Sequence, residues 1–175
     1  MTHNRRIARR FTATIMSAGL AAAVFGASAQ AACPSGATTV RIQALKEQAP
    51  QLFLDVRGGA TSTSGARIQL WSWTGGANQK WCMIPRTGGY YEFKSVDTNF
   101  CISEGFPSNG ASIELRLCDL RLSQQWAPLN TYQWRNALDN RCLDVTSGVY
   151  AAGTLLQAWA CTTPAGNQRF VVGRL

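Results

Sequence analysis

One block of sequence occurs three times along this chain, and this internal repeat constrains the fold more than any other feature. Each copy holds a short apolar segment, a central strand-like segment and a closing Gln-x-aromatic triplet. The closing aromatic residues are Trp81, Trp126 and Phe170, which lie 45 and 44 residues apart. A steady period of this length indicates one supersecondary unit used three times, whose copies must pack together to bury their apolar faces.

The first 31 residues have the features of a secretory signal peptide. Four arginines between positions 5 and 10 form a basic start, and the run from Thr14 to Gly26 is apolar and rich in alanine. Small residues then provide a cleavage site after Ala29 or Ala31. The run is shorter than the roughly 20 residues that a transmembrane helix needs. We therefore expect a secreted protein without a membrane span.

Two details of export stay open at this stage. Lipidation at Cys33 is the less favoured alternative, because Gln30 occupies a position where a lipoprotein signal has an aliphatic residue. Paired arginines are also compatible with twin-arginine export, although no clean motif follows either pair.

Removing this segment changes the chemistry that the chain can perform. The remaining residues, 32–175, include thirteen basic and nine acidic side chains in a scattered arrangement, so nucleic acid is not an expected partner. The only histidine, His3, is removed as well. Histidine is the commonest general base and metal ligand, so its absence argues against most hydrolase mechanisms and against a metal or other cofactor. We expect no catalytic residues.

Six cysteines in an exported chain predict disulfides. Cys101 and Cys118 occupy the same repeat positions as Cys142 and Cys161, so each pair should close within its own repeat. Phe53 and Trp73 occupy these positions in the first repeat and could fill the same volume. By elimination, the third bridge is Cys33–Cys82. A metal site is the rival interpretation, but the chain has no C-x-x-C spacing.

The remaining pattern predicts strands throughout. Segments 38–44, 90–95 and 132–137 open the three units, and 54–56, 68–71 and 81–84 are further short strands between glycine-rich turns. No segment has a convincing helical period. We therefore predict an all-β fold, a β-trefoil with pseudo-threefold symmetry and disulfide-stapled repeats at about 38–84, 90–130 and 132–174, in one domain that spans residues 32–175.

The repeats resemble those of the ricin B-type lectins, also called family 13 carbohydrate-binding modules. The family motif is C-L-D-V, then I/V-Q-L-W-x-C, then N-Q-x-W, and this chain carries it in register three times. The resemblance implies a β-trefoil lectin with up to three shallow sugar sites.

A sugar offers adjacent hydroxyls and an apolar face, so it is bound by a carboxylate, amides and an exposed flat aromatic ring. By resemblance, an aspartate accepts from two hydroxyls, a tryptophan stacks on the ring and an asparagine bonds a hydroxyl. The second glutamine of each set instead positions the aspartate or the loop. The predicted carbohydrate-binding residues are Asp55, Gln69, Trp71, Asn78 and Gln79 in the first repeat, and Asp144, Gln157, Trp159, Asn167 and Gln168 in the third.

The second repeat departs from this pattern. Ser103, Glu114, Arg116 and Ser123 replace the aspartate, glutamine, tryptophan and asparagine, and only Gln124 is kept. We predict that this copy folds normally and does not bind sugar.

Three classes of function follow. The leading class is a non-catalytic lectin for glycans or polysaccharides of galactose or xylan type. The alternative is a glycan-binding and docking subunit of a multi-component bacterial toxin or secreted enzyme complex, with a catalytic partner protein. A glycosidase is the least favoured class, because its two carboxylates would come from Asp55, Asp144, Glu104 or Glu114, which lie in different lobes or lack a partner. Aspartates that only bond their own turns, and tryptophans that only pack, are the structural alternatives.

Overall fold

Short segments rich in β-branched and aromatic residues form twelve strands, joined by glycine-containing turns. A computed structural model of the chain describes Met1 and residues 33–59 and 63–175; residues 2–31 of the predicted signal peptide lie outside this part. The strands are β1 (Thr38–Ala44), β2 (Leu52–Val56), β3 (Ile68–Ser72), β4 (Trp81–Pro85), β5 (Tyr91–Ser95), β6 (Phe100–Glu104), β7 (Ala111–Leu117), β8 (Trp126–Pro128), β9 (Trp134–Asn136), β10 (Cys142–Val145), β11 (Leu156–Trp159) and β12 (Phe170–Arg174).

The only helical elements in the described ranges are single 3₁₀ turns, as the sequence predicted for an all-β chain. They are η1 (Ala77–Gln79), η2 (Thr87–Gly89), η3 (Leu122–Gln124) and η4 (Thr146–Gly148). Within these ranges no helix is long and apolar enough to cross a membrane.

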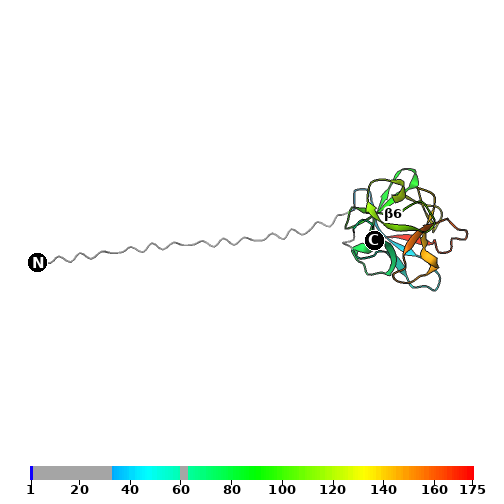
Figure 1. The fold of residues 1–175 in the computed structure, drawn as a ribbon, viewed down its shortest axis with the longest axis horizontal. Helices are drawn as coiled ribbons and strands as arrows, with labels where there is room; N and C mark the ends of the chain where they lie inside the picture. The colour runs from blue at the N-terminus through cyan, green and yellow to red at the C-terminus, as the bar shows by residue number, and fades with distance from the viewer. Residues whose placement is uncertain (2–32, 60–62) are drawn as a thin grey trace.

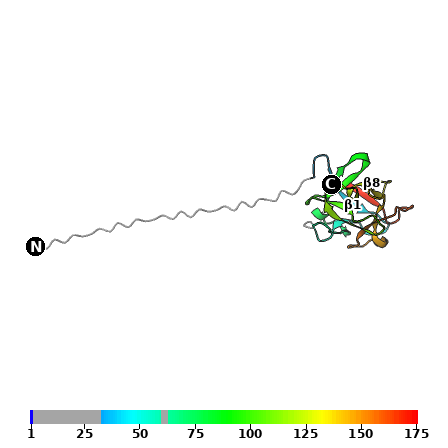
Figure 2. The same ribbon diagram turned by 45° about the horizontal axis from the view of Figure 1, so that its top comes forward.

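Six strands form the ring of a barrel. Strand β1 pairs with β4 and β12, β4 pairs with β5, β5 with β8, and β8 with β9, all antiparallel. The Phe170 N–H donates to the Tyr132 carbonyl at 2.8 Å, which joins β12 to the segment before β9 and closes the ring. In Figure 1 the three repeats occupy successive sectors around the domain, from cyan through green and yellow to orange and red. Figure 2 shows the same strands after a 45° turn.

The other six strands form three hairpins, β2–β3, β6–β7 and β10–β11, one in each repeat. The hairpins lock together through one repeated hydrogen bond from a turn glycine to the next repeat. Gly65 donates to Leu115 O at 2.7 Å, Gly110 to Ala158 O at 2.9 Å, and Gly153 to Leu70 O at 2.8 Å. Each accepting residue directly precedes position 71, 116 or 159, so the turn of one repeat lies beside the exposed residue of another.

The closing aromatic residue of each repeat is buried in the centre of the molecule, as predicted. Trp81, Trp126 and Phe170 are 0%, 1% and 0% exposed. They belong to one cluster with the apolar residues of all three hairpins, including Leu54 and Leu143. One shared core explains why a single repeat could not fold alone.

The three predicted disulfides all form. Cys101–Cys118 and Cys142–Cys161 each close within their own repeat, and Cys33–Cys82 ties the start of the domain to β4. In the first repeat an aromatic pair fills the equivalent place: the rings of Phe53 and Trp73 lie 5.2 Å apart. The Arg41 guanidinium covers both rings at 5.5 and 5.4 Å.

Candidate carbohydrate-binding sites

The hairpin of the first repeat places a carboxylate and two amides together. In the register of β2 and β3, Asp55 is directly opposite Gln69, so both side chains lie on one face of the hairpin. The Gln69 amide donates to Asp55 Oδ1 at 2.9 Å. The 3₁₀ turn η1 brings Asn78, whose amide donates to Asp55 Oδ2 at 2.6 Å. Residues from three segments of the repeat therefore fix this carboxylate in one orientation.

The third repeat builds the same arrangement. Asp144 is opposite Gln157 in the register of β10 and β11, and it accepts from the Gln157 amide at 2.8 Å. The Asn167 amide donates to the same oxygen at 2.8 Å. The Gln168 amide donates to the other oxygen at 3.0 Å. The structure thus brings together the predicted polar residues of each set.

Both aspartates are buried beneath the surface, at 4% exposure for Asp55 and 2% for Asp144. Burial raises the pKa of each carboxyl, while the hydrogen bonds from the neighbouring amides act in the opposite direction. The amides therefore favour the ionised form, which is the form that accepts hydrogen bonds on both oxygens.

A tryptophan on the same hairpin is exposed in both repeats. Trp71 and Trp159 are 41% and 40% exposed, whereas the preceding residues Leu70 and Ala158 are fully buried. This contrast follows from strand alternation, which points neighbouring side chains to opposite faces. A large aromatic surface left in solvent beside a fixed carboxylate is suited to stacking on a ligand ring.

The glutamine of the closing triplet holds the loop that follows the tryptophan strand. Gln79 is fully buried, donates to the Ser72 carbonyl at 2.8 Å and accepts from the Thr74 N–H at 2.7 Å. Gln168 makes the equivalent bonds to Ala160 O and Thr162 N, at 2.9 Å each. The sequence had suggested this positioning role.

A turn from another repeat borders each tryptophan, a feature that sequence reasoning missed. Gly153 and Gly110 have φ angles of +89° and +85°, so each turn favours glycine. A Cβ atom would lie 3.8 Å from Trp71 at the first position and 3.9 Å from Trp159 at the second. Each site is therefore shaped by two repeats, which no single repeat sequence reveals.

The third-repeat site also adjoins a hollow of about 500 Å³ beside Asn167. Lys46 crosses its edge, where its ammonium lies 4.9 Å from the Tyr150 ring and donates to the Gly148 carbonyl at 3.2 Å. The Tyr150 hydroxyl is buried and has no hydrogen-bond partner. Sequence reasoning did not single out either side chain.

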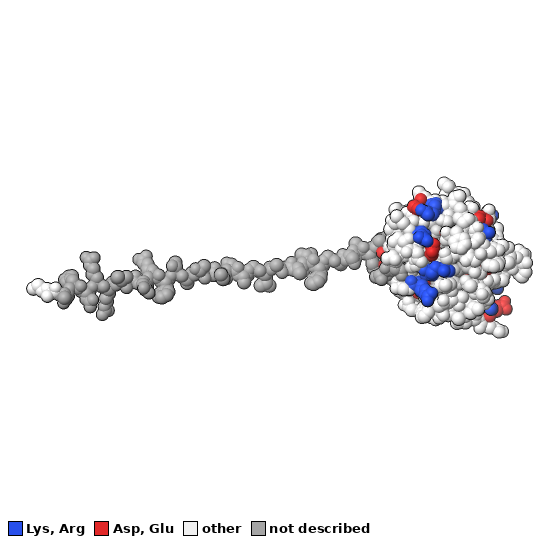
Figure 3. Space-filling view, in the orientation of Figure 1, with Lys and Arg blue, Asp and Glu red and all other residues white. Residues whose placement is uncertain are grey.

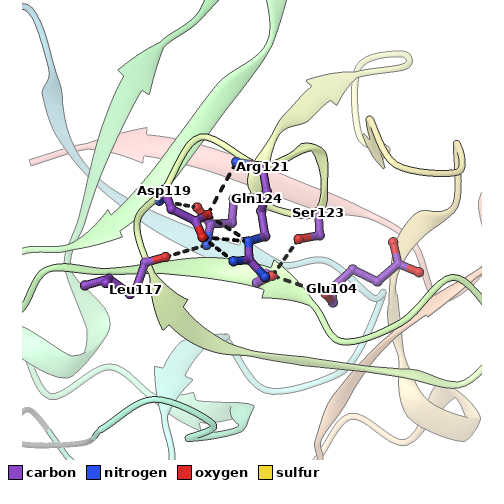
Figure 4. Close-up of polar contacts among 7 residues, drawn as sticks. Glu104, Leu117, Asp119, Arg121, Ser123 and Gln124 are labelled. Atoms are coloured by element: carbon purple, nitrogen blue, oxygen red, sulfur yellow. Dashed lines mark hydrogen bonds and ion pairs between the residues drawn. The ribbon is translucent and has the colours of Figure 1, made fainter.

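The second repeat has a different site in the same place. Ser103 and Ser123 hydrogen-bond to each other at 3.0 Å, and the Arg116 guanidinium pairs with Glu114 at 2.7 Å. Gln124 keeps the loop-holding role, with bonds to Leu117 O at 2.8 Å and Asp119 N at 3.0 Å. Figure 4 shows the contacts of Ser123 and Gln124, together with the ion pair between Arg121 and Asp119.

The carboxylates considered as a catalytic pair have different surroundings in the described ranges. In residues 33–59 and 63–175, no group of three or more His, Cys, Asp or Glu side chains is arranged to hold a metal ion. Asp55 and Asp144 lie in separate repeats among amides, and Glu114 is engaged by Arg116. Glu104 is only 2% exposed.

The fold and the sites define a β-trefoil protein whose first and third repeats carry surface sites of one design. Residues 38–170 match the ricin-type β-trefoil lectin domain, and the chain belongs to this family. Membership implies carbohydrate binding. A comparison with curated proteins finds no match.

Solved structures show the same fold at low sequence identity. ThreeFoil, a designed threefold-symmetric protein, has a TM-score of 0.70 at 22% identity, with 78% of this chain and 99% of that chain covered. The C-half of the earthworm R-type lectin, in complex with GalNAc, has a TM-score of 0.60 at 19% identity, with 79% and 99% covered. A mosquitocidal holotoxin has a TM-score of 0.68 at 17% identity, but this chain spans only 17% of its length.

Proposed function

We propose that this protein is a secreted, non-catalytic lectin that binds neutral sugars at the first and third repeats. One observation carries the proposal: a buried aspartate, held by amides, lies on the same hairpin as a half-exposed tryptophan in these two repeats. The ionised carboxylate would accept from adjacent sugar hydroxyls. The tryptophan would cover the apolar face of the ring.

The asparagine and first glutamine in each set orient the carboxylate, and their remaining amide atoms could reach a sugar hydroxyl. Galactose-type sugars and xylan-type polymers are the first candidates. GalNAc in the earthworm lectin and N-acetyl-D-lactosamine in the Vibrio vulnificus haemolysin lectin are ligands of proteins with this fold.

A glycan array, followed by titration calorimetry with the best monosaccharide, tests the proposal. Asp55→Ala combined with Asp144→Ala should abolish measurable binding, because a hydrogen bond to a charged group contributes about 1.5–3 kcal/mol and the sites are shallow. Asp97→Ala is the matched control, since Asp97 lies in the turn between β5 and β6, away from both sites. Unchanged affinity in the double variant would place the sugar sites elsewhere.

Secretion and the absence of catalysis have their own tests. N-terminal sequencing of the exported protein should start at Gln30 or Ala32 if the predicted signal peptide is cleaved. Incubation with labelled glycans should give no turnover.

The second candidate function is docking to a catalytic partner, and the surface of the second repeat favours it. Several large apolar side chains are exposed there, including Leu117 at 55%, Leu120 at 59% and Leu129 at 43%. The holotoxin and an exo-β-1,3-galactanase from Clostridium thermocellum carry this fold in much longer chains, of which this chain spans 17% and 31%. Co-expression with proteins encoded by neighbouring genes, followed by size-exclusion chromatography, would reveal a stable complex.

A further inference from the structure

We infer that the second repeat binds a sugar that carries a carboxylate, such as a uronic or sialic acid unit of a glycan. The inference rests on the proposed lectin function and extends it to the repeat that lacks the aspartate and the tryptophan. It replaces the expectation that this repeat is inactive.

A hollow of about 510 Å³ lies in the second repeat, at the position equivalent to the predicted sugar sites of the other two. Its wall contains residues equivalent to the predicted sugar-binding set, namely Ser103, Arg116 and Ser123. The second repeat therefore has a hollow at the position where the other repeats place the aspartate.

The floor of the hollow supplies hydroxyl groups in place of the carboxylate. Ser103 Oγ lies 3.1 Å from the Glu104 carbonyl and 3.0 Å from Ser123 Oγ. Because Ser103 donates to that carbonyl, Ser123 donates to Ser103, and lone pairs on both oxygens remain for hydroxyl donors of a ligand. The Glu104 side chain points away from this cluster in Figure 4, so its acid group does not enter the site.

An aromatic platform is present, but on another wall. Arg116 replaces the tryptophan, while Phe106 lines the hollow and is 54% exposed. Leu122 and Leu138, at 52% and 38% exposure, add apolar surface around it. The hollow therefore offers a ring face for stacking together with hydroxyls for hydrogen bonding, which are two of the three features that a sugar requires.

Two guanidinium groups lie at the rim of this hollow. The side chains of Arg116 and Arg121 are 48% and 59% exposed. Glu114, which pairs with Arg116, is only 9% exposed, so the positive group lies outside and the negative group beneath it. Gly105 permits this arrangement, since a Cβ there would collide with Ser112 Oγ and come within 3.3 Å of Glu114 Oε1.

Each arginine keeps donors for a ligand. Arg116 contacts Glu114 through Nε and Nη2, and Arg121 contacts Asp119 through the same two nitrogens. Among the described residues, none accepts from Nη1 of either side chain. A carboxylate accepts hydrogen bonds from guanidinium groups with better geometry than from any other side chain. An acidic sugar has hydroxyls for the serines, a ring face for the phenylalanine and a carboxylate for the arginines.

The experiment uses the Asp55→Ala/Asp144→Ala variant, in which the two aspartate sites are disabled. D-glucuronic, D-galacturonic and N-acetylneuraminic acids are titrated into the labelled protein, and amide NMR shifts of residues 103–106 and 121–123 are followed. We expect at least one acid to bind at least tenfold more tightly than D-glucose or D-galactose. Arg116→Gln or Arg121→Gln should weaken it fivefold or more, and Phe106→Ala should weaken it too.

Arg174→Gln is the matched control, because it removes the same charge from the exposed end of strand β12, outside the hollow. Equal binding of neutral and acidic sugars would overturn the inference, as would acid binding that the Arg116 and Arg121 variants leave unchanged. If acetate competes with the acidic sugar as strongly as a second acidic sugar does, the hollow is only a general anion-binding site and the inference is overturned. Neutral-sugar titration of the parent protein separately decides the proposed lectin function.

Discussion

At the scale of single residues, the sequence predicted which side chains lie together but not which hydrogen bonds they form with one another. Asp55 and Asp144, the carboxylates proposed to accept from sugar hydroxyls, are nearly buried and are held by amides. The first glutamine of each set, which the sequence predicted as a carbohydrate-binding residue, is the residue opposite the aspartate and donates a hydrogen bond to it. The period of a strand predicts which face a residue occupies, but hydrogen-bond partners depend on the register between strands.

Glu104 is a second residue whose surroundings only the fold reveals. It is 2% exposed, and no hydrogen-bond donor reaches either carboxylate oxygen. Burial raises the pKa of Glu104 to about 8, the nearby Asp139 carboxylate adds to this increase, and Arg141 lowers it. In the equivalent positions the other repeats have the apolar residues Val56 and Val145, so a neutral Glu104 fits where a charged one does not.

This raised pKa predicts a pH-dependent stability. The native state holds the Glu104 proton up to a pH of about 8, whereas the unfolded chain releases it near 4.5. The stabilising contribution is therefore complete below about pH 4.5 and declines by about 1.4 kcal/mol per pH unit as the pH rises toward 8. Glu104→Gln should gain stability relative to the parent between pH 5 and pH 8, as measured by urea unfolding. Glu47→Gln, which removes an exposed carboxylate, is the control for the loss of one charge, and equal slopes in Glu104→Gln and parent would refute the assignment.

At the scale of elements, the repeat pattern was sufficient for most of the fold. Strand β1 has the predicted bounds, and the disulfides follow the repeat positions. The predicted strand over 132–137 shortens to β9, Trp134–Asn136, because Tyr132 already bonds Phe170 and Gln133 bonds the Asn130 side chain. The contacts between turns and neighbouring repeats could not be predicted, since they join residues of similar sequence in different copies.

The aromatic pair of the first repeat should contribute about as much to the free energy of unfolding as the disulfide that replaces it in another repeat. Phe53 is 3% exposed and packs against Trp73, in the place of a disulfide. Phe53→Ala should cost about 3–5 kcal/mol, the usual range for a buried phenylalanine. Loss of Cys101–Cys118 in a Cys→Ala double variant should cost a similar amount, about 2–4 kcal/mol. Urea unfolding measures both, and a loss below about 1 kcal/mol for Phe53→Ala would show that the pair does not replace the bridge.

At the scale of the whole molecule, three repeats with one backbone plan carry two kinds of polar cluster. Figure 3 shows that most of the visible face is uncharged and that acidic side chains lie next to basic ones. A face of this kind gives little long-range attraction for polyanions. The rigid core fixes the distance between the clusters.

This rigidity leads to a prediction about valency. A shallow site that binds a monosaccharide with a dissociation constant near 1 mM contributes only about −4 kcal/mol. The first and third repeats together should bind a polymer that presents the same sugar up to about 10²–10⁴-fold more tightly, because the second contact is intramolecular. Calorimetry with a neutral monosaccharide should give a stoichiometry near two, falling to one in Asp144→Ala. The same variant should lose the advantage for the polymer while its monosaccharide affinity at the first repeat stays unchanged. A neutral-sugar stoichiometry of three would mean that the second repeat binds without needing a carboxylate on its ligand, and polymer binding that Asp144→Ala leaves intact would mean that the two sites do not act together.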